Sequence, residues 1–466
     1  MSDDSPDNVV SDTIAAIATP PGVGGIGVLR VSGPDALDIS LRIVRRPGRG
    51  RPRARHAHLV SVVDPAQDER LVDQALLLYM PAPHSFTGED VVELQGHGGP
   101  LVVRTILDLL LQAGARLAQA GEFSLRAFLN GRLDLAQAEA VADLVAAPTP
   151  EALAVAADQL AGRLSGASRD IRRACLDLLA QMEAEIDFVD DDVPPMPPAK
   201  VAATLDDLDA RLNVILAGAD RGILQRHGIR VAIVGSPNVG KSSLLNALLA
   251  TERAIVTEVP GTTRDVLEES FDFDGVPVVL SDTAGIRQTD DLVERLGVER
   301  SAQALTGADI ALLVLDASRP LIEADHEALR GVRDAAKPSI LTLNKRDLPG
   351  ALGRADVAGL VPGAITCRTS ASESDLTELY AALRETIGGT TPNGDLATVA
   401  SVRHKQALLH ASEELQGSRR AVAEGLPADF VTVGLRGAVL ALGEITGESA
   451  TEDLLDTIFA KFCIGK

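Results

Sequence analysis

The sequence contains no tryptophan and is poor in other aromatic residues and in cysteine. Its 466 residues include nine Phe, two Tyr and three Cys. Proteins that stack single-stranded bases need a platform of aromatic side chains, and eleven scattered rings do not favour such a platform. Cys175, Cys367 and Cys463 lie far apart in the chain, which excludes a disulfide framework and a Cys-x-x-Cys metal site.

Long apolar runs are also missing, and we expect no leader sequence. The run Ile310–Leu315 has the length of a strand and is far shorter than the roughly 18 residues that a membrane span needs. The first seven residues are polar and acidic, unlike a signal peptide. We therefore expect a cytoplasmic protein with no membrane contact, and its 45% hydrophobic residues suffice for sizeable cores.

Positive charge is scarce, since 44 Lys and Arg face 66 Asp and Glu and the formal net charge is −22. This balance argues against a protein that coats nucleic acid, so any RNA contact must be local. The basic cluster consists of Arg45, Arg46, Arg49, Arg51, Arg53 and Arg55. Two interpretations remain open for it, namely a solvated arginine-rich loop and a loop that contacts phosphates.

The length predicts about three domains. Short strand patterns mixed with turns indicate an α+β domain over residues 1–130, with strands at Ile26–Val31, Ala75–Tyr79 and Val91–Leu94 and a helix near Leu101–Leu111. A helical pattern follows over 131–227, alternating strands and helices over 228–389, and a second helical pattern over 390–466. We expect a multidomain α/β protein in which a doubly wound, mostly parallel module is inserted into one discontinuous helical domain.

The first helical region carries an apolar stripe with an average spacing of 3.6 residues from Leu153 to Val189, which predicts one long helix. Cys175 lies on this stripe, so we interpret it as a buried core residue. The prolines after Val193 end the helix because proline lacks an N–H donor. At the other end of the chain, Ser449–Glu452 has the pattern of a capping box and predicts the start of the last helix.

The α/β module opens with a phosphate-binding motif. Residues 235–242, Gly-Ser-Pro-Asn-Val-Gly-Lys-Ser, match G-x-x-x-x-G-K-[ST] between a predicted strand and a predicted helix. The glycines allow backbone N–H groups to surround phosphates at the helix N-terminus. Lys241 is expected to reach the β- and γ-phosphates, and the Ser242 hydroxyl to bind Mg²⁺.

Four further segments make this module a GTP-binding domain. Residues 282–285, Asp-Thr-Ala-Gly, match DxxG, and residues 344–347, Asn-Lys-Arg-Asp, match NKxD. The carboxylate of Asp347 can accept two hydrogen bonds from guanine that adenine does not offer, so it selects GTP. Residues 261–265 supply a switch threonine for Mg²⁺, and residues 369–371 close the base pocket.

The residue after DTAG is Ile286, where small signalling GTPases carry a glutamine that orients the attacking water. Hydrolysis therefore needs another group. The residues alone leave open Arg287, the acidic side chains of Asp290, Asp291 and Glu294, and a monovalent cation bound by the amide oxygen of Asn238.

The whole chain resembles the MnmE (TrmE) family of tRNA-modification GTPases. The segments that carry the resemblance are 18–30, 85–90, 93–99, 121–130, 133–140, the GTTRD element at 261–265 and the C-terminal Phe-Cys-Ile-Gly-Lys at 462–466. The resemblance implies an N-terminal domain that binds tetrahydrofolate and forms a homodimer. It also implies a flavin-dependent partner, GidA (MnmG), with which a heterotetramer forms.

With this partner, the family adds a carboxymethylaminomethyl or aminomethyl group to carbon 5 of the wobble uridine of tRNA. The resemblance implies GTP as substrate, Mg²⁺ and K⁺ as ions, and 5,10-methylene- or 5-formyl-tetrahydrofolate as cofactor, with FAD supplied only by the partner. The family's folate ligands fall on Arg30, Glu93, Arg132 and Lys466. Position 132 is lysine in some relatives and arginine in this chain. The positive charge is therefore kept, while the geometry of its contacts can differ.

The remaining site residues also follow from the resemblance. The water-positioning acid falls on Glu294, and Arg287 matches as a second catalytic residue. Mg²⁺ falls on Ser242 and Thr263, and K⁺ on Asn238, Thr257, Val259 and Thr262. The expected GTP contacts are Asn238, Val239, Gly240, Lys241, Ser242, Ser243, Thr257, Glu258, Val259, Pro260, Gly261, Thr262, Thr263, Asp282, Thr283, Ala284, Gly285, Asn344, Lys345, Asp347, Ser370, Ala371 and Ser372.

A rival interpretation from another class is a regulatory GTPase of the ribosome-assembly type, whose N-terminal domain is an interaction module. Such proteins usually append a basic RNA-binding module, whereas residues 381–466 carry 8 basic and 11 acidic side chains. A stand-alone folate enzyme with a degenerate GTPase domain is disfavoured by the intact motifs. We assign Cys463 either to folate chemistry or to packing at a domain junction.

Overall fold

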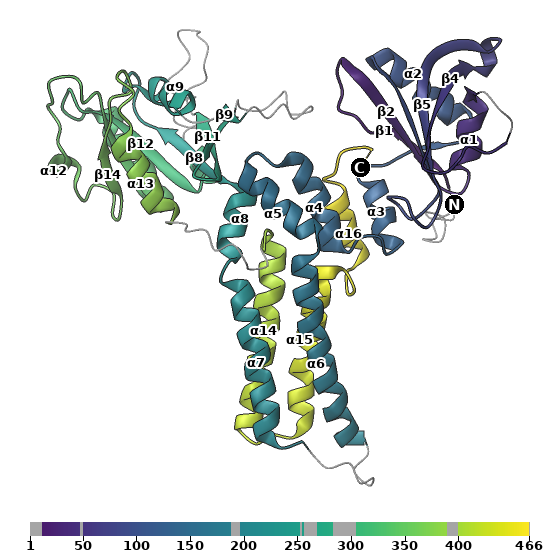
Figure 1. Cartoon of the computed structure of the whole chain (residues 1–466). Coiled ribbons are helices and arrows are strands. Elements are labelled where there is room, and N and C mark those ends of the chain that lie inside the picture. The colour runs from purple at the N-terminus through teal and green to yellow at the C-terminus, as the bar shows by residue number, and fades with distance from the viewer. Residues whose placement is uncertain are drawn as a thin grey trace, which may run out of the picture. The chain divides into compact units, whose positions relative to one another are not determined.

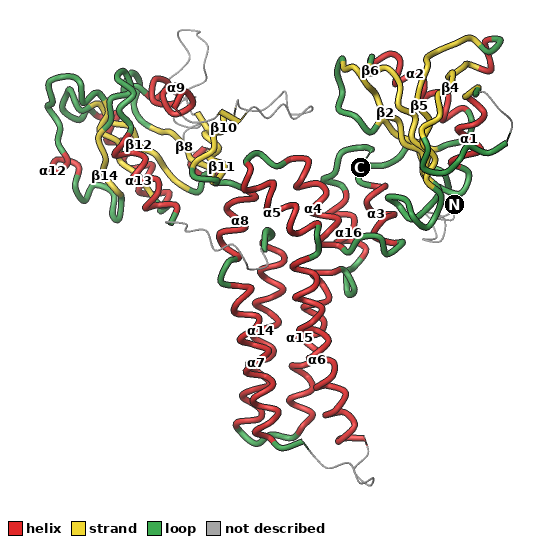
Figure 2. The backbone as a smooth tube through the Cα atoms, viewed as in Figure 1, coloured by secondary structure: helices red, strands yellow, loops and turns green. Residues whose placement is uncertain are grey.

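The computed structural model describes residues 12–46, 50–187, 196–251, 254–255, 268–282, 304–388 and 399–465 (Figures 1 and 2). Its packing divides the chain into two units. The first unit comprises Met1–Ala146, Ala157–Asn213 and Arg403–Lys466, and the second comprises Ala147–Ala156 and Val214–Val402. Among the described residues, no helix combines the length and the apolar character that crossing a membrane requires.

The first unit begins with a seven-stranded sheet in the order β3-β4-β5-β6-β2-β1-β7. Neighbouring strands are antiparallel except for β1 and β7, which are parallel. Its elements are β1 (Ile14–Ile17), β2 (Gly24–Ser32), α1 (Ala36–Ile43), β3 (Val44–Arg45), β4 (Ala57–Asp64), a short 3₁₀ turn (Pro65–Gln67), β5 (Arg70–Met80), β6 (Val91–Gly98), α2 (Pro100–Gln112), β7 (Arg116–Leu117) and α3 (Glu122–Leu129).

Alternate residues of this sheet face a core shared with α1 and α2. Leu29 and Val31 of β2 and Leu94 of β6 are buried in that core together with Ile106 and Leu110 of α2. The intervening residues on β2 and β6 point to the opposite face, as a sheet covered on one side requires. The strands and the helix predicted for this region are confirmed, and each is somewhat longer than its sequence pattern.

Helices from both ends of the chain complete the first unit. They are α4 (Leu135–Ala146), α5 (Pro150–Leu160, whose first part belongs to the second unit), α6 (Arg163–Asp187), α7 (Pro198–Leu216), α14 (Val402–Ala423), α15 (Ala428–Thr446) and α16 (Glu452–Phe459). Figure 1 shows α6, α7, α14 and α15 running side by side. Ser412 of α14 donates to Asp209 of α7 over 2.5 Å, and Arg436 of α15 pairs with Glu183 of α6 at 2.6 Å. The predicted discontinuous helical domain is confirmed, because its halves pack together.

Two predictions about these helices were wrong in detail. The apolar stripe from Leu153 to Val189 is divided between α5 and α6, because Gly162 adopts a φ of +79° that interrupts the helix. The last helix starts at Glu452, and its N-cap is Thr451, whose hydroxyl accepts a hydrogen bond from Leu454 N. The hydroxyl of Ser449 instead donates to Leu440 O at 2.9 Å.

The second unit contains a seven-stranded sheet in the order β14-β13-β12-β8-β11-β10-β9. Its elements are α8 (Ala219–His227), β8 (Ile229–Val234), α9 (Lys241–Thr251), β9 (Ala254–Ile255), β10 (Glu268–Phe273), β11 (Val276–Asp282), β12 (Ile310–Asp316), α11 (Glu323–Ala335), β13 (Ser339–Asn344), α12 (Arg354–Val357), β14 (Ile365–Arg368) and α13 (Thr377–Ile387). Only β10 runs antiparallel to its neighbours, so the predicted mostly parallel sheet is confirmed.

Strand β12 lies in the interior of this sheet, between β13 and β8, and is buried along its whole length. Ile310, Leu312 and Val314 belong to one apolar core, and Ala311 and Leu313 belong to another. Helices cover both faces of a doubly wound sheet, so its central strands are apolar on both sides. The carboxyl ends of β8, β12 and β13 therefore meet at one edge, where ligands bind in such folds.

Candidate functional site

The phosphate-binding loop connects β8 to α9 and has the backbone that the motif requires. Gly235 and Gly240 have φ values of +151° and +97°, and a Cβ atom at either would overlap Val314 O or the Asn344 amide. Only glycine fits these two positions. Lys241 Nζ donates to Gly235 O and Ser236 O, at 2.8 Å each, so the ammonium group lies within the arch of the loop.

The first turn of α9 follows this loop and exposes the hydroxyl groups of Ser242 and Ser243. A hydroxyl oxygen at a helix N-terminus, next to a phosphate cradle, is the hard neutral ligand that suits Mg²⁺ when phosphate oxygens share it. Within the described ranges, no group of three or more His, Cys, Asp or Glu side chains is arranged to hold a metal. The exposed hydroxyl of Ser242 fits the predicted role of a Mg²⁺ ligand beside the phosphate loop.

The loop after β13 links the phosphate loop to the predicted base pocket. The Asn344 amide donates to Val239 O at 2.9 Å, and its oxygen accepts from the Thr369 hydroxyl and from Ala371 N at 3.2 Å each. One side chain thus connects three segments that are distant in the sequence. The NKxD asparagine fixes the relative positions of the loops that would hold phosphate and base.

Asp347 lies at the open end of this loop. The Ser370 hydroxyl donates to its carboxylate at 2.7 Å and is itself 3.1 Å from the Ser372 hydroxyl. The hydrogen bond from Ser370 holds the pKa of Asp347 below its usual value, so the group is an anion at neutral pH. An ionised and accessible carboxylate can accept two N–H donors from a guanine edge.

A second set of polar residues at this edge has no counterpart in the sequence motifs. Asp325 of α11 is buried and accepts from the Ser236 hydroxyl at 2.5 Å and from Arg319 at 2.6 Å. Asp316, the last residue of β12, forms an ion pair with Lys345 at 2.7 Å. The loop between β12 and α11 therefore supports both the phosphate loop and the base loop. The sequence feature that could have identified Asp316 as a site residue is its position at the carboxyl end of an apolar strand.

Several predicted nucleotide residues lie outside the described residues. Asp282 ends β11 at the expected edge, although its side chain is not described. The predicted residues that fall outside are Thr257, Glu258, Val259, Pro260, Gly261, Thr262, Thr263, Thr283, Ala284, Gly285, Arg287 and Glu294. The structure therefore describes only Asn238 of the predicted K⁺ ligands and only Ser242 of the predicted Mg²⁺ ligands.

The predicted folate residues of the first unit lie on the sheet face opposite α1 and α2. Arg30 of β2 and Glu93 of β6 are paired in the antiparallel register, and Arg30 Nη2 lies 2.9 Å from Glu93 Oε1. The guanidinium group lies 5.3 Å from the ring centroid of Phe86 and 5.8 Å from that of Phe123. Arg30 and Glu93 side chains are 20% and 14% exposed, so the pair is accessible to a ligand.

The other predicted folate residues come from loops. The exposed Arg132 donates to Ser85 O at 3.1 Å and so lies beside the segment that carries Phe86. Lys466 is outside the described residues, but the residues before it return to the N-terminal sheet. Ile464 forms an antiparallel bridge with Ala120, and Gly465 packs so closely on Ile17 that a Cβ would overlap its carbonyl. The structure thus brings Ile464 and Gly465 back to the N-terminal domain.

The three cysteines differ in their environments. Cys175 and Cys367 are buried, and burial raises the pKa of their thiols to about 12 and about 11. The prediction that Cys175 is a core residue is confirmed. Cys463 is exposed, and its carbonyl accepts a long hydrogen bond of 3.5 Å from Gly121 N at the junction with α3.

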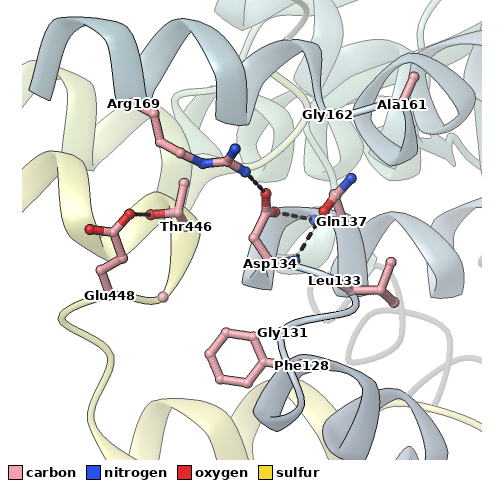
Figure 3. Close-up of a pocket in the computed structure, with 11 residues that line it drawn as sticks. Phe128, Gly131, Leu133, Asp134, Gln137, Ala161, Gly162, Arg169, Thr446 and Glu448 are labelled. Carbon is pink, nitrogen blue, oxygen red and sulfur yellow. Dashed lines mark hydrogen bonds and ion pairs between the residues drawn. The ribbon is translucent and has the colours of Figure 1, made fainter. Parts of the chain in front are cut away.

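A pocket of about 560 Å³ lies in the first unit between α3, α4, α6 and the end of α15 (Figure 3). Its charged groups are mostly paired with their neighbours. Asp134 pairs with Arg169 and accepts from Gln137 N at 2.9 Å, and Glu448 accepts from Thr446. Residues from the first and second parts of the helical region therefore line the same pocket.

Comparisons with known proteins cover nearly the whole chain. A family model described as the GTP-binding protein TrmE N-terminus matches residues 13–132, and the MnmE helical domain model matches residues 135–463. The tRNA modification GTPase MnmE of Chloroflexus aurantiacus is 49% identical over 464 residues, which is 98% of this chain and all of the relative. The proteins of that name from Heliobacterium modesticaldum and Synechocystis are 46% and 47% identical, with the same two coverages.

One similar solved structure covers the GTPase module of the chain. The G domain of the FeoB iron transporter of T. maritima matches 34% of this chain and 99% of its own, with 27% identity and a TM-score of 0.27.

Proposed function

The chain belongs to the MnmE family of tRNA modification GTPases, and from this premise we propose that it binds GTP, hydrolyses it and takes part in tRNA modification. The proposal rests on the edge of the second sheet at which β8, β12 and β13 end, which we call the nucleotide edge. There Asn344 joins the phosphate loop to the base loop, and the carboxylate of Asp347 is accessible to a ligand. Full-length identity of 45–49% with proteins of this name supports the same activity for the whole chain.

We propose the modification to be an aminomethyl or carboxymethylaminomethyl group at carbon 5 of the wobble uridine. It requires a one-carbon tetrahydrofolate and the flavoprotein partner GidA (MnmG). Support for the folate comes from Arg30, a cation held over two aromatic rings and paired with Glu93. Such a site offers a flat apolar wall for a pterin ring, with donors and an acceptor at its rim.

We also propose the domain boundaries 1–130, 131–227, 228–389 and 390–466, and a homodimer formed through the first domain. Mg²⁺ held through Ser242 and Thr263 would neutralise phosphate charge. K⁺ held by Asn238, Thr257, Val259 and Thr262 would stand where an arginine finger stands in other GTPases. Glu294 would position the attacking water, with Arg287 beside it in the chain.

The most direct test measures wobble nucleosides by mass spectrometry in cells that lack this gene. We expect the modified uridine to disappear and to return with the wild-type gene. The Asp347→Asn gene should restore it poorly, whereas a surface control, Arg330→Gln, should restore it fully. An unchanged nucleoside profile in the deletion strain would contradict the proposed modification and favour a regulatory GTPase of the ribosome-assembly type.

A second test addresses hydrolysis with the purified protein at saturating GTP and constant ionic strength. Replacing K⁺ by Na⁺ should slow hydrolysis on the order of tenfold or more, because a larger cation exchanges its hydration shell for neutral oxygens more readily. Glu294→Ala should bind GTP normally and hydrolyse it slowly, while Asp290→Ala and Asp291→Ala serve as matched controls. Equal rates with both cations contradict the K⁺ site, and an active Glu294→Ala protein contradicts the role of Glu294.

A further inference from the structure

The segment from residue 39 to residue 63 has a charge opposite to that of the rest of the chain. It contains seven of the 37 arginines and two histidines, and no Asp or Glu, although the whole chain carries −22. The described arginines of this segment lie between the end of α1 and the start of β4, and β3 and β4 are the two outermost strands at one edge of the N-terminal sheet. We call Arg42, Arg46, Arg51, Arg53 and Arg55 the arginine edge.

Most of this positive charge has no counter-charge. Arg42 and Arg55 donate to the carbonyl oxygens of Ala113 and His84, which satisfy hydrogen bonds without neutralising charge. Arg51 is 71% exposed and reaches a carboxylate, that of Asp38, only at 3.8 Å. Among the described residues, no carboxylate oxygen lies within 4 Å of the other members of the edge, Arg46 and Arg53 included.

The neighbouring Arg45 differs from the arginine edge because a carboxylate neutralises its charge. Its guanidinium group forms a two-pronged ion pair with Glu69 at the turn between β4 and β5. The arginine edge lacks such partners, so its field extends into solvent. Because ions screen charges beyond about 8 Å at physiological salt, the distant acidic residues of this chain do not cancel that field.

The loop that carries these arginines is anchored to the sheet. Pro52 is buried, Arg55 N donates to Tyr79 O at 2.8 Å, and a ring nitrogen of His58 lies 3.1 Å from Arg53 O. These contacts fix the backbone of the five residues from which the exposed side chains of Arg51, Arg53 and Arg55 project. Cations carried on a fixed backbone lose less conformational entropy on binding than those of a free arginine-rich tail.

We propose that the arginine edge binds the sugar–phosphate backbone of the tRNA substrate. The inference rests on the proposed function, which supplies a polyanion as substrate, and it resolves the two interpretations of the basic cluster. Guanidinium groups contact phosphate with two parallel hydrogen bonds, which favours arginine over lysine for this role. The edge carries no Phe, Tyr or Trp among residues 42–58, so it binds the backbone and does not read bases.

The test compares tRNA binding by the full-length wild-type protein with that of a triple variant, Arg46→Gln, Arg51→Gln and Arg53→Gln. The matched control is Arg330→Gln, Arg333→Gln and Arg354→Gln, which removes three exposed charges from the second unit. Fluorescence anisotropy of labelled tRNA is measured between about 50 and 200 mM salt. Melting curves and GTP hydrolysis without tRNA verify that each variant is folded and active.

We expect the triple variant to bind tRNA on the order of 10- to 100-fold more weakly at 100 mM salt. The slope of log affinity against log salt should fall by about 0.7 to 0.9 for each phosphate that the variant no longer neutralises. Replacing the same residues by Lys should restore most of the salt slope but less of the affinity, because the charge returns without the two-pronged geometry. The control variant should keep both the slope and the affinity of the wild type.

Other outcomes overturn the inference. Unchanged affinity and slope in the triple variant would show that the edge is only solvated, and an equal loss in the control would show a general charge effect. Binding of anionic lipid vesicles that depends on the edge, with unchanged tRNA binding, would assign it to membranes instead. A wild-type protein with no affinity for tRNA would overturn the proposed function together with this surface, whereas binding that survives in the triple variant overturns the surface alone.

Discussion

The two units use charged side chains for different purposes. In the first unit, Arg126 and Glu139 lie almost fully buried among partners from distant parts of the chain. In the second unit, Asp347 and Lys241 lie at the edge of a sheet, where loops hold them ready for a ligand. Buried clusters of this kind join elements, whereas the nucleotide edge is arranged to bind.

This difference predicts whether a substitution lowers the stability of the protein or its affinity for a ligand. Removing one member of a buried ion cluster leaves its partners unpaired in a medium of low polarity, so it costs stability. When a side chain at the nucleotide edge is removed, water takes its place in the free protein. Such a substitution therefore lowers the affinity for the nucleotide more than the stability of the fold. Five predictions test this contrast, and the Arg30–Glu93 pair is the case that decides whether the first unit also contains a binding site.

The largest effect is expected for Arg126→Met. Arg126 is 2% exposed and contacts Asp12 at 2.5 Å, Glu122 at 2.9 Å and Glu89 at 3.2 Å. Methionine fills much of the volume but removes the cation from Glu89 and leaves Asp12 and Glu122 with Arg116 alone, which costs about 3–5 kcal/mol. Chemical denaturation should show this loss, while Arg104→Met, an exposed change on α2, should have little effect. Equal stabilities would mean that the cluster is hydrated and not a buried junction.

The next effect concerns Glu139, which contacts His404 at 2.8 Å and Arg403 at 3.0 Å across the two parts of the helical region. Burial alone would raise its pKa, but His404 and Arg403 outweigh burial and lower the pKa to about 2. A lowered pKa contributes stability above the unfolded value of about 4.5, and this contribution disappears as pH falls towards 2. The contribution is about 3 kcal/mol.

Denaturation between pH 6 and pH 2 checks this prediction. Glu139→Gln should be less stable at pH 6 and should lose less stability on acidification, whereas Glu183→Gln, which removes a surface pair, should follow the wild type. Parallel curves for the wild type and Glu139→Gln would contradict the assignment of the pH dependence to this carboxylate.

In the second unit, Asp347→Asn should weaken GTP binding on the order of 100-fold without changing the melting temperature. The amide presents a donor where guanine also presents donors, so two hydrogen bonds are replaced by a repulsion. The same variant should bind xanthosine triphosphate better than the wild type does. Titration with fluorescent nucleotides measures both, and wild-type GTP affinity in the variant would refute the assignment of the base loop.

Arg30→Ala then tests the contrast within the first unit. If the pair with Glu93 is a binding site, the variant should lose on the order of tenfold or more in affinity for 5-formyl-tetrahydrofolate by calorimetry. Its stability should fall less than that of Arg126→Met, because the side chains of Arg30 and Glu93 are 20% and 14% exposed and water can partly solvate the remaining carboxylate. A large loss of stability with unchanged folate affinity would place this pair with the structural clusters.

The smallest effect is expected for Ser236→Ala at the phosphate loop. The hydroxyl donates to Asp325 at 2.5 Å, and its loss costs about 1 kcal/mol, or roughly fivefold in GTP affinity. Asp325→Asn should weaken binding by a similar factor, and the double variant should lose less than the sum because the two residues form one contact. Fully additive losses would indicate that they act independently.

Most helices and strands and all of the nucleotide motifs could be predicted from the order of residues alone. Strand β12 is apolar on both faces, which indicates a doubly wound sheet, and residues 235–242 and 344–347 form loops whose local order sets their chemistry. The residues of each motif are neighbours in the chain, so their geometry follows from short-range backbone rules. The resemblance to a family supplied the folate residues, which no local pattern marks.

Tertiary structure decided the contacts between residues distant in sequence. Asp325 supports Ser236 across 89 residues, Arg403 and His404 reach Glu139 across the inserted module, and Gly465 packs against Ile17. Even the break between α5 and α6 depends on the φ of Gly162, which the 3.6-residue period does not reveal. A side chain's partner is set by which strands and helices become neighbours, and that is a property of the packed chain as a whole.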